Sequence, residues 1–362
     1  MKNFYFLLAI LFLFSGWNNE MKAQDIHFSQ FYQSPLNLNP AMTGVMQCNH
    51  RFVVNYRNQW SSVLRSNSFS TYSLSYDHKI AVGRDDYFGV GVSLWGDQAG
   101  ESNFSTTQGR LSGSFSKFMS GDRSRSNYLV VGADLGIAQR DLDISRLQWG
   151  TQHDGLGGFD PNAPSGENFD RDNFFFADIS LGLMWFTTWR EGGSVYFGAA
   201  AHHVNRPNQS FFGDNNIELY TKYTLHGGGE YQLNPRFALV PNLVAFFQGP
   251  SFQLNSGLSA RFELGSRNDP QSFQIGAWLR LVNNYEWGFN AAENIATEDY
   301  SIGADAIILT SRFDFEFFGL GFSYDINVSD LRRATNGNGA FELSFIYYIC
   351  GPEVRGVYCP RW

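Results

Sequence analysis

The sequence predicts an all-β protein, a transmembrane β-barrel of about fourteen antiparallel strands. Three observations support this prediction: an excess of aromatic residues, a hydrophobic period of two along most of the chain, and a regular alternation of long and short connections. The 362 residues include 35 Phe, 17 Tyr and 9 Trp, yet only 17% of them are charged. Typical soluble domains have about 25% charged residues.

The composition also argues against other classes of protein. Mean hydropathy is −0.27, and no stretch approaches the ~20 consecutive apolar residues that a membrane-spanning helix needs. The many aromatic residues can bury enough surface to oppose disorder. A formal charge of −8 and a pI of 5.4 argue against a nucleic-acid partner.

The N-terminus has the pattern of a signal peptide, residues 1–23. Lys2 precedes the apolar run Phe4–Phe14, which is too short to span a bilayer. Cleavage is expected after Ala23, and no cysteine follows that position to indicate a lipoprotein. The mature chain is then expected to have three parts. These are a periplasmic or lumenal segment (24–50), the barrel (51–349) and a periplasmic tail (350–362).

Beyond residue 50 apolar and small or polar residues alternate. Phe88, Val90 and Val92, for example, alternate with Gly89 and Gly91. This period is typical of a strand with two different faces, and long alternating strands separated by turns are typical of transmembrane barrels. Such segments are expected at 51–59, 69–79, 87–96, 105–118, 127–139, 173–187, 194–203, 220–231, 236–247, 252–264, 272–282, 299–310, 313–326 and 340–349.

The connections between these segments differ in length in a regular way. The odd-numbered ones are mostly long: 60–68, 97–104, 140–172, 204–219, 248–251, 283–298 and 327–339. The even-numbered ones are short: 80–86, 119–126, 188–193, 232–235, 265–271 and 311–312. Outer-membrane barrels carry long loops outside and short turns in the periplasm. The even strand number predicts that both termini are periplasmic, and glycines and serines should face the narrow lumen.

Patterns for chemistry are sparse. No nucleophile elbow or phosphate-binding glycine motif occurs, and His202 and His203 are adjacent on a predicted strand, so they should point to opposite faces. The carboxylates of loop 151–173 lack the spacing of a calcium loop. We therefore expect no catalytic residue, no metal and no cofactor. Three cysteines allow at most one internal disulfide; Cys48–Cys359 and Cys350–Cys359 are the expected alternatives.

Several blocks of the chain recur in one known family. They are Gln24–Gly44, Arg51–Trp60, Asp143–Gly150, His202–His203 with Pro207–Phe211, Tyr223–Gly228, Phe322–Ser329 with Glu342–Ser344, and Cys359–Arg361. Together they closely resemble the PorP/SprF family of type IX secretion system membrane proteins of Bacteroidetes. The resemblance implies an outer-membrane barrel that assists export of large surface proteins with a C-terminal sorting domain, in some members gliding adhesins. It supplies no catalytic residues. The implied partners are the secretion machinery, such a cargo and outer-membrane lipid.

Two groups of motif residues are candidates for a site. In the first segment, proline disfavours a helical conformation in the residue before it, and asparagine can bond its own backbone in turns. The segment should be ordered and irregular, beside the periplasmic mouth, as a plug, a rim brace or a docking site. Its candidates are Pro35, Asn37, Asn39, Pro40 and Gly44.

The second group, Arg57, Gln59 and Trp60, is expected to anchor the first strand at the outer rim. The leading functional hypothesis is a non-enzymatic component of type IX secretion. The alternative is a passive or gated solute channel, and a third hypothesis, a barrel lipid hydrolase, would need a close Ser–His pair on the outer surface.

Overall fold

The computed structural model describes residues 25–121, 124–155, 158–167, 169–189, 192–212, 217–265, 270–290, 295–351 and 359–360, without the side chains of 284–300. The expected signal peptide and its cleavage site lie outside these residues. Within them, no helix is both long enough and apolar enough to traverse a bilayer.

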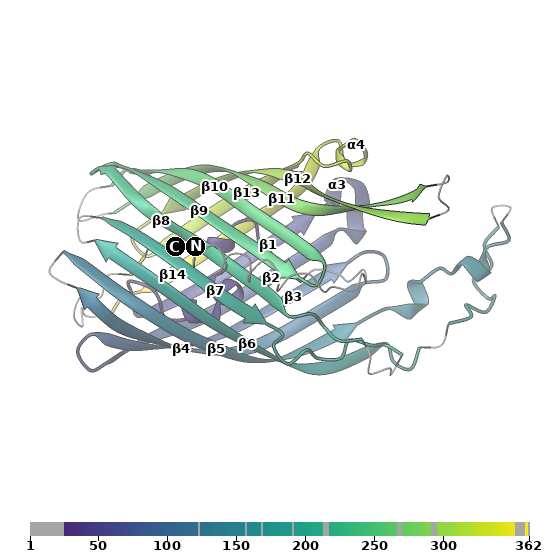
Figure 1. Cartoon of the computed structure of the whole chain (residues 1–362), viewed down its shortest axis with the longest axis horizontal. Coiled ribbons are helices and arrows are strands. Elements are labelled where there is room, and N and C mark those ends of the chain that lie inside the picture. The colour runs from purple at the N-terminus through teal and green to yellow at the C-terminus, as the bar shows by residue number, and fades with distance from the viewer. Residues whose placement is uncertain are drawn as a thin grey trace, which may run out of the picture.

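Fourteen antiparallel strands form one closed barrel, in which each strand pairs with its neighbours in sequence and β1 pairs with β14. This confirms the predicted fold class (Figure 1). The strands are β1 (His50–Gln59), β2 (Phe69–Val82), β3 (Asp86–Ala99), β4 (Phe104–Gly121), β5 (Arg125–Asp141), β6 (Asn173–Trp189), β7 (Gly193–His202), β8 (Lys222–Asn234), β9 (Phe237–Gln248), β10 (Ser251–Glu263), β11 (Ser272–Asn290), β12 (Ile295–Asp314), β13 (Phe318–Asn327) and β14 (Asn338–Ile349).

The largest differences from the predicted strands lie in β11 and β12. Both strands extend into the predicted connection at 283–298, because β11 continues to Asn290 and β12 begins at Ile295. Asn283 resembles a turn residue, but its side chain bonds the adjacent β9–β10 turn by accepting from Phe252 N (2.7 Å) and donating to Pro250 O (2.8 Å). The turn predicted at 311–312 lies inside β12, and the chain reverses at 315–317 instead.

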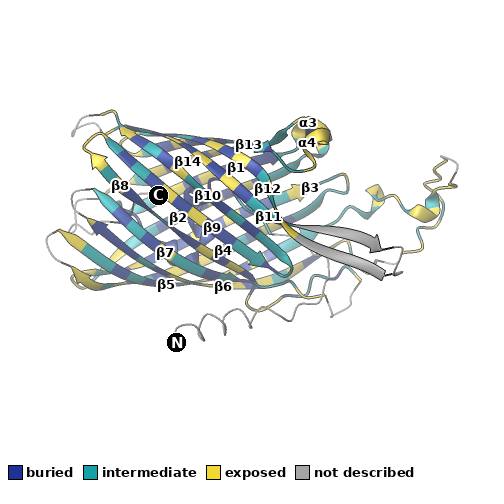
Figure 2. Ribbon diagram, turned by 45° about the horizontal axis from the view of Figure 1, so that its top comes forward, coloured by how far each residue is buried: buried dark blue, intermediate teal, exposed yellow. Residues whose placement is uncertain are grey.

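The two faces of the sheet are inverted relative to a soluble protein. On β3, Val90, Val92 and Leu94 point outward and are 45–55% exposed, whereas inward-facing Ser93 is 2% exposed. Figure 2 shows buried and exposed residues alternating along the strands. An apolar outer face and a polar interior suit a barrel surrounded by lipid.

Short turns and long connections lie at opposite ends of the barrel. Here the end with the turns 83–85, 235–236 and 315–317 is named the short-turn rim, and the other end the long-loop rim. The long-loop rim carries α3 (Ser61–Leu64), α4 (Arg332–Thr335) and the projecting connection 142–172 (Figure 1). The tight turn 249–250 also lies at this rim, as the sequence predicts.

Candidate functional site

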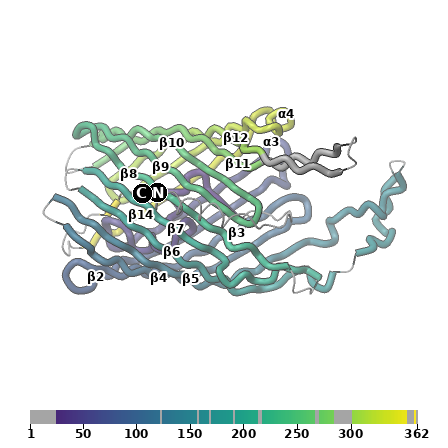
Figure 3. The backbone as a smooth tube through the Cα atoms, in the orientation of Figure 1, coloured from purple at the N-terminus to yellow at the C-terminus, as the bar shows by residue number. Residues whose placement is uncertain are grey.

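The barrel interior is filled by the chain's own first segment. Residues 25–46, named the plug here, contain the short helices η1 (Phe31–Gln33), α2 (Pro35–Leu38) and η2 (Pro40–Met42). The tube in Figure 3 shows this purple segment enclosed by the strands. Ala41, Met42 and Val45 are 0% exposed, so the plug is packed against the wall.

An apolar cluster gives the plug its core. Phe31 and Tyr32 pack against the inward-facing Trp278 of β11, with ring centroids 5.7 and 5.5 Å apart. Leu38 and Met42 belong to the same buried cluster as residues from the barrel wall: Tyr128, Val130, Met184, Phe186, Tyr196, Val244 and Ile308. The lumen is thus a small hydrophobic core as well as a polar surface.

The plug runs from one rim to the other. At the long-loop rim, Asp25 N donates to Gln248 Oε1 (2.9 Å), and at the short-turn rim Lys79 Nζ donates to Met46 O (2.7 Å). The sequence predicts an ordered periplasmic or lumenal segment beside the periplasmic mouth, with a plug as one alternative. The structure shows a plug that extends along the whole length of the lumen. Sequence patterning cannot reveal this because the plug has no long regular element.

The motif residues at 35–40 shape the plug and tie it to the wall. Pro35 and Pro40 begin α2 and η2, where a helix tolerates the missing N–H. Asn39 accepts from Ala41 N (2.9 Å), as the expected turn requires, and its amide faces Leu183 O and Ala199 O at 3.2 Å.

Asn37 bridges the plug to two strands. Its amide donates to Ser73 Oγ on β2 (2.6 Å), and its Oδ1 accepts from Arg110 of β4. The two asparagines therefore do more than stabilise turns, because they replace the hydrogen bonds that lumenal groups would otherwise make to water.

Gly44 lies where the plug meets a buried ion pair. Its φ is +71°, a value that favours glycine, and its N–H donates to Asp77 Oδ2 (2.7 Å). Asp77 also pairs with Arg51 (2.7 Å), and neither side chain is exposed. Arg51 in turn donates to Met42 O (3.1 Å). Sequence reasoning missed Arg51 and Asp77, although both are charged residues on the inward face of a strand.

A second charged group, named the Ser29 cluster, holds the part of the plug that lies toward the long-loop rim. Glu342 of β14 accepts from Ser29 N (2.6 Å) and Gln30 N (2.9 Å) and pairs with Arg57. Asp325 of β13 accepts from Ser29 Oγ (2.9 Å) and pairs with Arg57 (3.2 Å) and Arg280 (2.8 Å).

Arg57 thus points into the lumen rather than anchoring the rim, since it lies on the inward-facing set of β1 and is buried. Its neighbours lie where the sequence predicts. Gln59 ends β1 and accepts from Arg57 (3.3 Å). Trp60 turns the chain into α3 and packs on Phe69, with centroids 5.1 Å apart. Of these three residues, Arg57 belongs to the Ser29 cluster.

Glycines make room for the plug, as the expected narrow lumen requires. A Cβ on Gly182 would lie 2.0 Å from Asn39 Oδ1, and one on Gly132 would lie 2.5 Å from the backbone of Pro40 and Ala41. Real Cβ atoms essentially never approach so closely, so a side chain at either position would require the plug to shift.

The start of the plug is held by a histidine between two carboxylates. His203 Nε2 lies 2.8 Å from Asp25 and Nδ1 lies 2.8 Å from Asp178 of β6. His202 and His203 were expected on opposite faces, yet both are buried, because β7 ends at His202 and His203 has a φ of +57°. Burial alone would lower the pKa of His203, but the two carboxylates outweigh it and raise the pKa to about 9.

Stability is therefore expected to fall at high pH. The charged His203 ring stabilises the fold fully below pH 6.5, its contribution declines as pH rises toward 9, and it is lost above 9. The full contribution corresponds to about 3 kcal/mol. Urea unfolding in detergent micelles between pH 6 and 10 measures this slope. His203→Gln should flatten it, and an unchanged slope in that variant would contradict the role of His203.

The cysteine pairing corrects the sequence expectation. Cys48 bonds Cys350, with Cα atoms 4.3 Å apart, and Cys359 is free and buried. Neither Cys48–Cys359 nor Cys350–Cys359 forms. The reason is barrel closure: β1 and β14 pair from His50 to Ile349, so the cysteines just outside these strand ends are brought together.

Loss of this disulfide is expected to destabilise the barrel by about 2–5 kcal/mol. It joins residues 302 positions apart at the strand seam. The Cys48→Ser and Cys350→Ser variants should show equal loss in urea unfolding. Cys359→Ser, which keeps the bond, is the matched control. A larger loss in the control than in the two bond variants would contradict this assignment.

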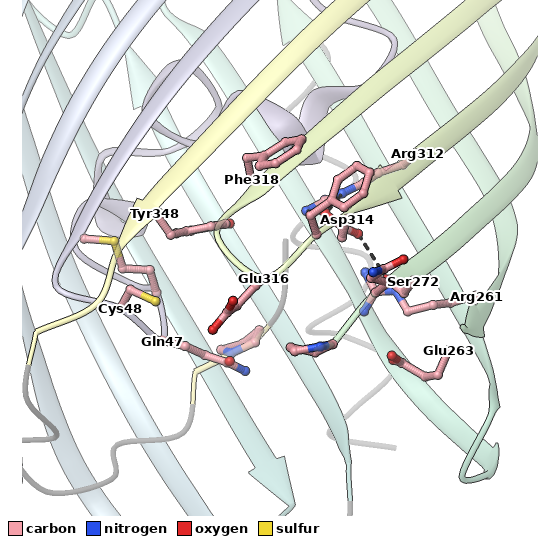
Figure 4. A pocket seen from close by; sticks show the side chains of 15 residues that line it. Gln47, Cys48, Arg261, Glu263, Ser272, Arg312, Asp314, Glu316, Phe318 and Tyr348 are labelled. Carbon is pink, nitrogen blue, oxygen red and sulfur yellow. Dashed lines mark hydrogen bonds and ion pairs between the residues drawn. The ribbon is translucent and has the colours of Figure 1, made fainter. Parts of the chain in front are cut away.

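A cavity of about 360 Å³ lies at the short-turn rim, beside Gln47 and Cys48 (Figure 4). Its arginines are already paired, Arg261 with Glu230 (2.7 Å) and Arg312 with Asp314 (2.7 Å). Among the described residues there is no group of three or more His, Cys, Asp or Glu side chains suited to a metal ion. The prominent feature of the molecule is therefore the plugged lumen.

Solved structures with similar architecture include three bacterial proteins. CdiB from Escherichia coli matches with 8% identity and a TM-score of 0.42, covering 82% of this chain and 63% of CdiB. The Ralstonia pickettii toluene transporter TbuX matches with 13% identity and a TM-score of 0.43, covering 88% and 94%. The Pseudomonas putida toluene transporter TodX matches with 12% identity and a TM-score of 0.42, covering 87% and 92%.

No protein with a curated description matches the chain. A family model for type IX secretion system membrane proteins matches residues 20–347 of the chain. That range includes the plug, the strands β1 to β13 and most of β14. It also includes the buried charged residues that join the plug to the wall. Family and fold together point to a non-enzymatic protein of the outer membrane that associates with the secretion machinery. The chain belongs to the PorP/SprF family of type IX secretion system membrane proteins.

Proposed function

We propose that this protein assists the export or surface attachment of large proteins with a C-terminal sorting domain, such as gliding adhesins, without catalysing a reaction. Family membership over residues 20–347 supports the secretion pathway. The observation that carries the proposal further is the plug, because its buried contacts fill the lumen. A barrel closed in this way serves its partners from its rims and outer wall.

In this proposal the long-loop rim faces the outside of the cell. The short-turn rim and the residues Cys359–Pro360 face the periplasm. The length of the connections supports this orientation, because outer-membrane barrels keep short turns in the periplasm. The outer rim then offers the projecting connection 142–172 to a cargo, and the periplasmic rim is available to the secretion machinery.

Deletion of the gene followed by surface proteomics tests the proposal. We expect at least one sorting-domain protein to disappear from the cell surface, while uptake of small solutes is unchanged. Complementation with the wild-type gene should restore that protein. If every sorting-domain protein still reaches the surface and uptake of a solute falls, the protein is a solute channel, the alternative that the sequence also raises.

A further inference from the structure

The first described residues lie at the long-loop rim. Asp25 bonds Gln248, the last residue of β9, and His203, which follows β7. Lys222, the first residue of β8, donates to Ile26 O (2.9 Å). All three partners stand where strands meet the connections 203–221 and 249–250 of that rim. The plug therefore begins at the end of the barrel opposite the short turns.

The following contacts lie in chain order from the long-loop rim toward the short-turn rim. Ser29 bonds Glu342, near the start of β14, and Asn39 reaches Leu183, in the middle of β6. Gly44 then bonds Asp77, in the half of β2 nearer the short-turn rim, and Met46 bonds Lys79 close to the turn 83–85. The segment thus crosses the lumen once and does not return before β1 begins.

The other end of the described chain lies at the short-turn rim. Cys359 Sγ is 3.6 Å from the hydroxyl of Tyr87, the second residue of β3. Gln47 donates to Cys359 O (3.4 Å). The tail therefore meets the plug where the plug leaves the lumen.

We propose that the mature chain crosses the outer membrane once inside its own barrel, so that its N-terminus lies at the cell surface and its C-terminal tail in the periplasm. The even strand number predicts both ends in the periplasm. That rule, however, places only the first residue of β1 and the last residue of β14, and the plug adds one more crossing. The direction of the crossing rests on the orientation proposed above, whereas the separation of the two ends does not.

Three single-cysteine variants test this topology with a membrane-impermeant maleimide. Ile26→Cys lies beside a cavity of about 170 Å³ at the long-loop rim. Asn162→Cys marks the projecting connection and Arg84→Cys marks a short turn, and both positions are exposed. Background labelling should be low, because Cys359 is buried and the other two cysteines are bonded.

We expect Ile26→Cys and Asn162→Cys to react in intact cells, and Arg84→Cys only after the outer membrane is permeabilised. Labelling of Ile26→Cys together with Arg84→Cys, on the side opposite Asn162→Cys, would overturn the crossing. If Arg84→Cys reacts in intact cells and Asn162→Cys does not, the proposed orientation fails, while Ile26→Cys still decides the crossing.

A second variant decides the matter if the cysteine at position 26 reacts under neither condition. An epitope inserted between Ala23 and Gln24 should bind its antibody on intact cells. Binding only after permeabilisation, in cells whose Asn162→Cys protein labels from outside, would overturn the proposal.

Discussion

Replacing Glu342 with alanine is expected to lower the free energy of unfolding by about 3–5 kcal/mol, the usual cost of breaking a buried ion pair. Glu342 is 2% exposed and pairs with Arg57. Its removal leaves part of the Arg57 charge uncompensated in the lumen. It also leaves the N–H groups of Ser29 and Gln30 without their acceptor, and an unsatisfied buried donor costs about 1–3 kcal/mol.

Urea unfolding of the purified barrel in detergent micelles measures this loss. Lys117→Ala is the matched control, since it removes an ion pair of normal length, 2.7 Å to Asp86, in which Lys117 is 56% exposed. The control should cost no more than about 1 kcal/mol. Equal losses in the two variants would show that the Ser29 cluster does not hold the plug.

Replacing Gly132 with valine is expected to destabilise the plugged barrel by about 3 kcal/mol, at the upper end of the cost of overpacking. The new Cβ would lie 2.5 Å from backbone atoms of Pro40 and Ala41. Backbone held by its own hydrogen bonds cannot turn aside as a flexible side chain can. The plug must therefore shift from the wall, and limited proteolysis should cut it faster.

Gly113→Val is the control for this substitution. Gly113 lies on the outward face of the neighbouring strand β4, and a Cβ there would meet nothing within 4 Å. Its effect should stay within about 0.5 kcal/mol. If valine at position 113 costs as much as valine at position 132, the loss reflects strand propensity rather than contact with the plug.

The strands could be predicted from the sequence because their signal is local. Inward Gly89 and Gly91 alternate with outward Phe88 and Val90 on β3, and this period survives without any knowledge of tertiary contacts. The β12–β13 turn was misplaced for the same reason, since the alternation of phenylalanines runs on through Phe313 to Phe317 and no glycine or proline marks the reversal.

The position of the plug could not be predicted in the same way. Pro35 and Asn39 indicate an ordered segment, but which wall residues receive it depends on pairs such as Ser29–Glu342, 313 positions apart. The Cys48–Cys350 bond could have been predicted, because it follows from pairing the first strand with the last. The position of Arg57 near the end of β1 indicates the rim, but the alternation of β1 directs its side chain into the lumen.

A closed lumen is the property that most directly separates a secretion component from a solute channel. Swelling of liposomes that contain the purified wild-type protein, in an isosmotic solution of a small sugar, measures it. We expect no swelling above that of empty liposomes, while a general porin and a variant lacking residues 25–43 both cause swelling. Wild-type liposomes that swell as fast as those with the deletion variant would contradict a plug that closes the barrel.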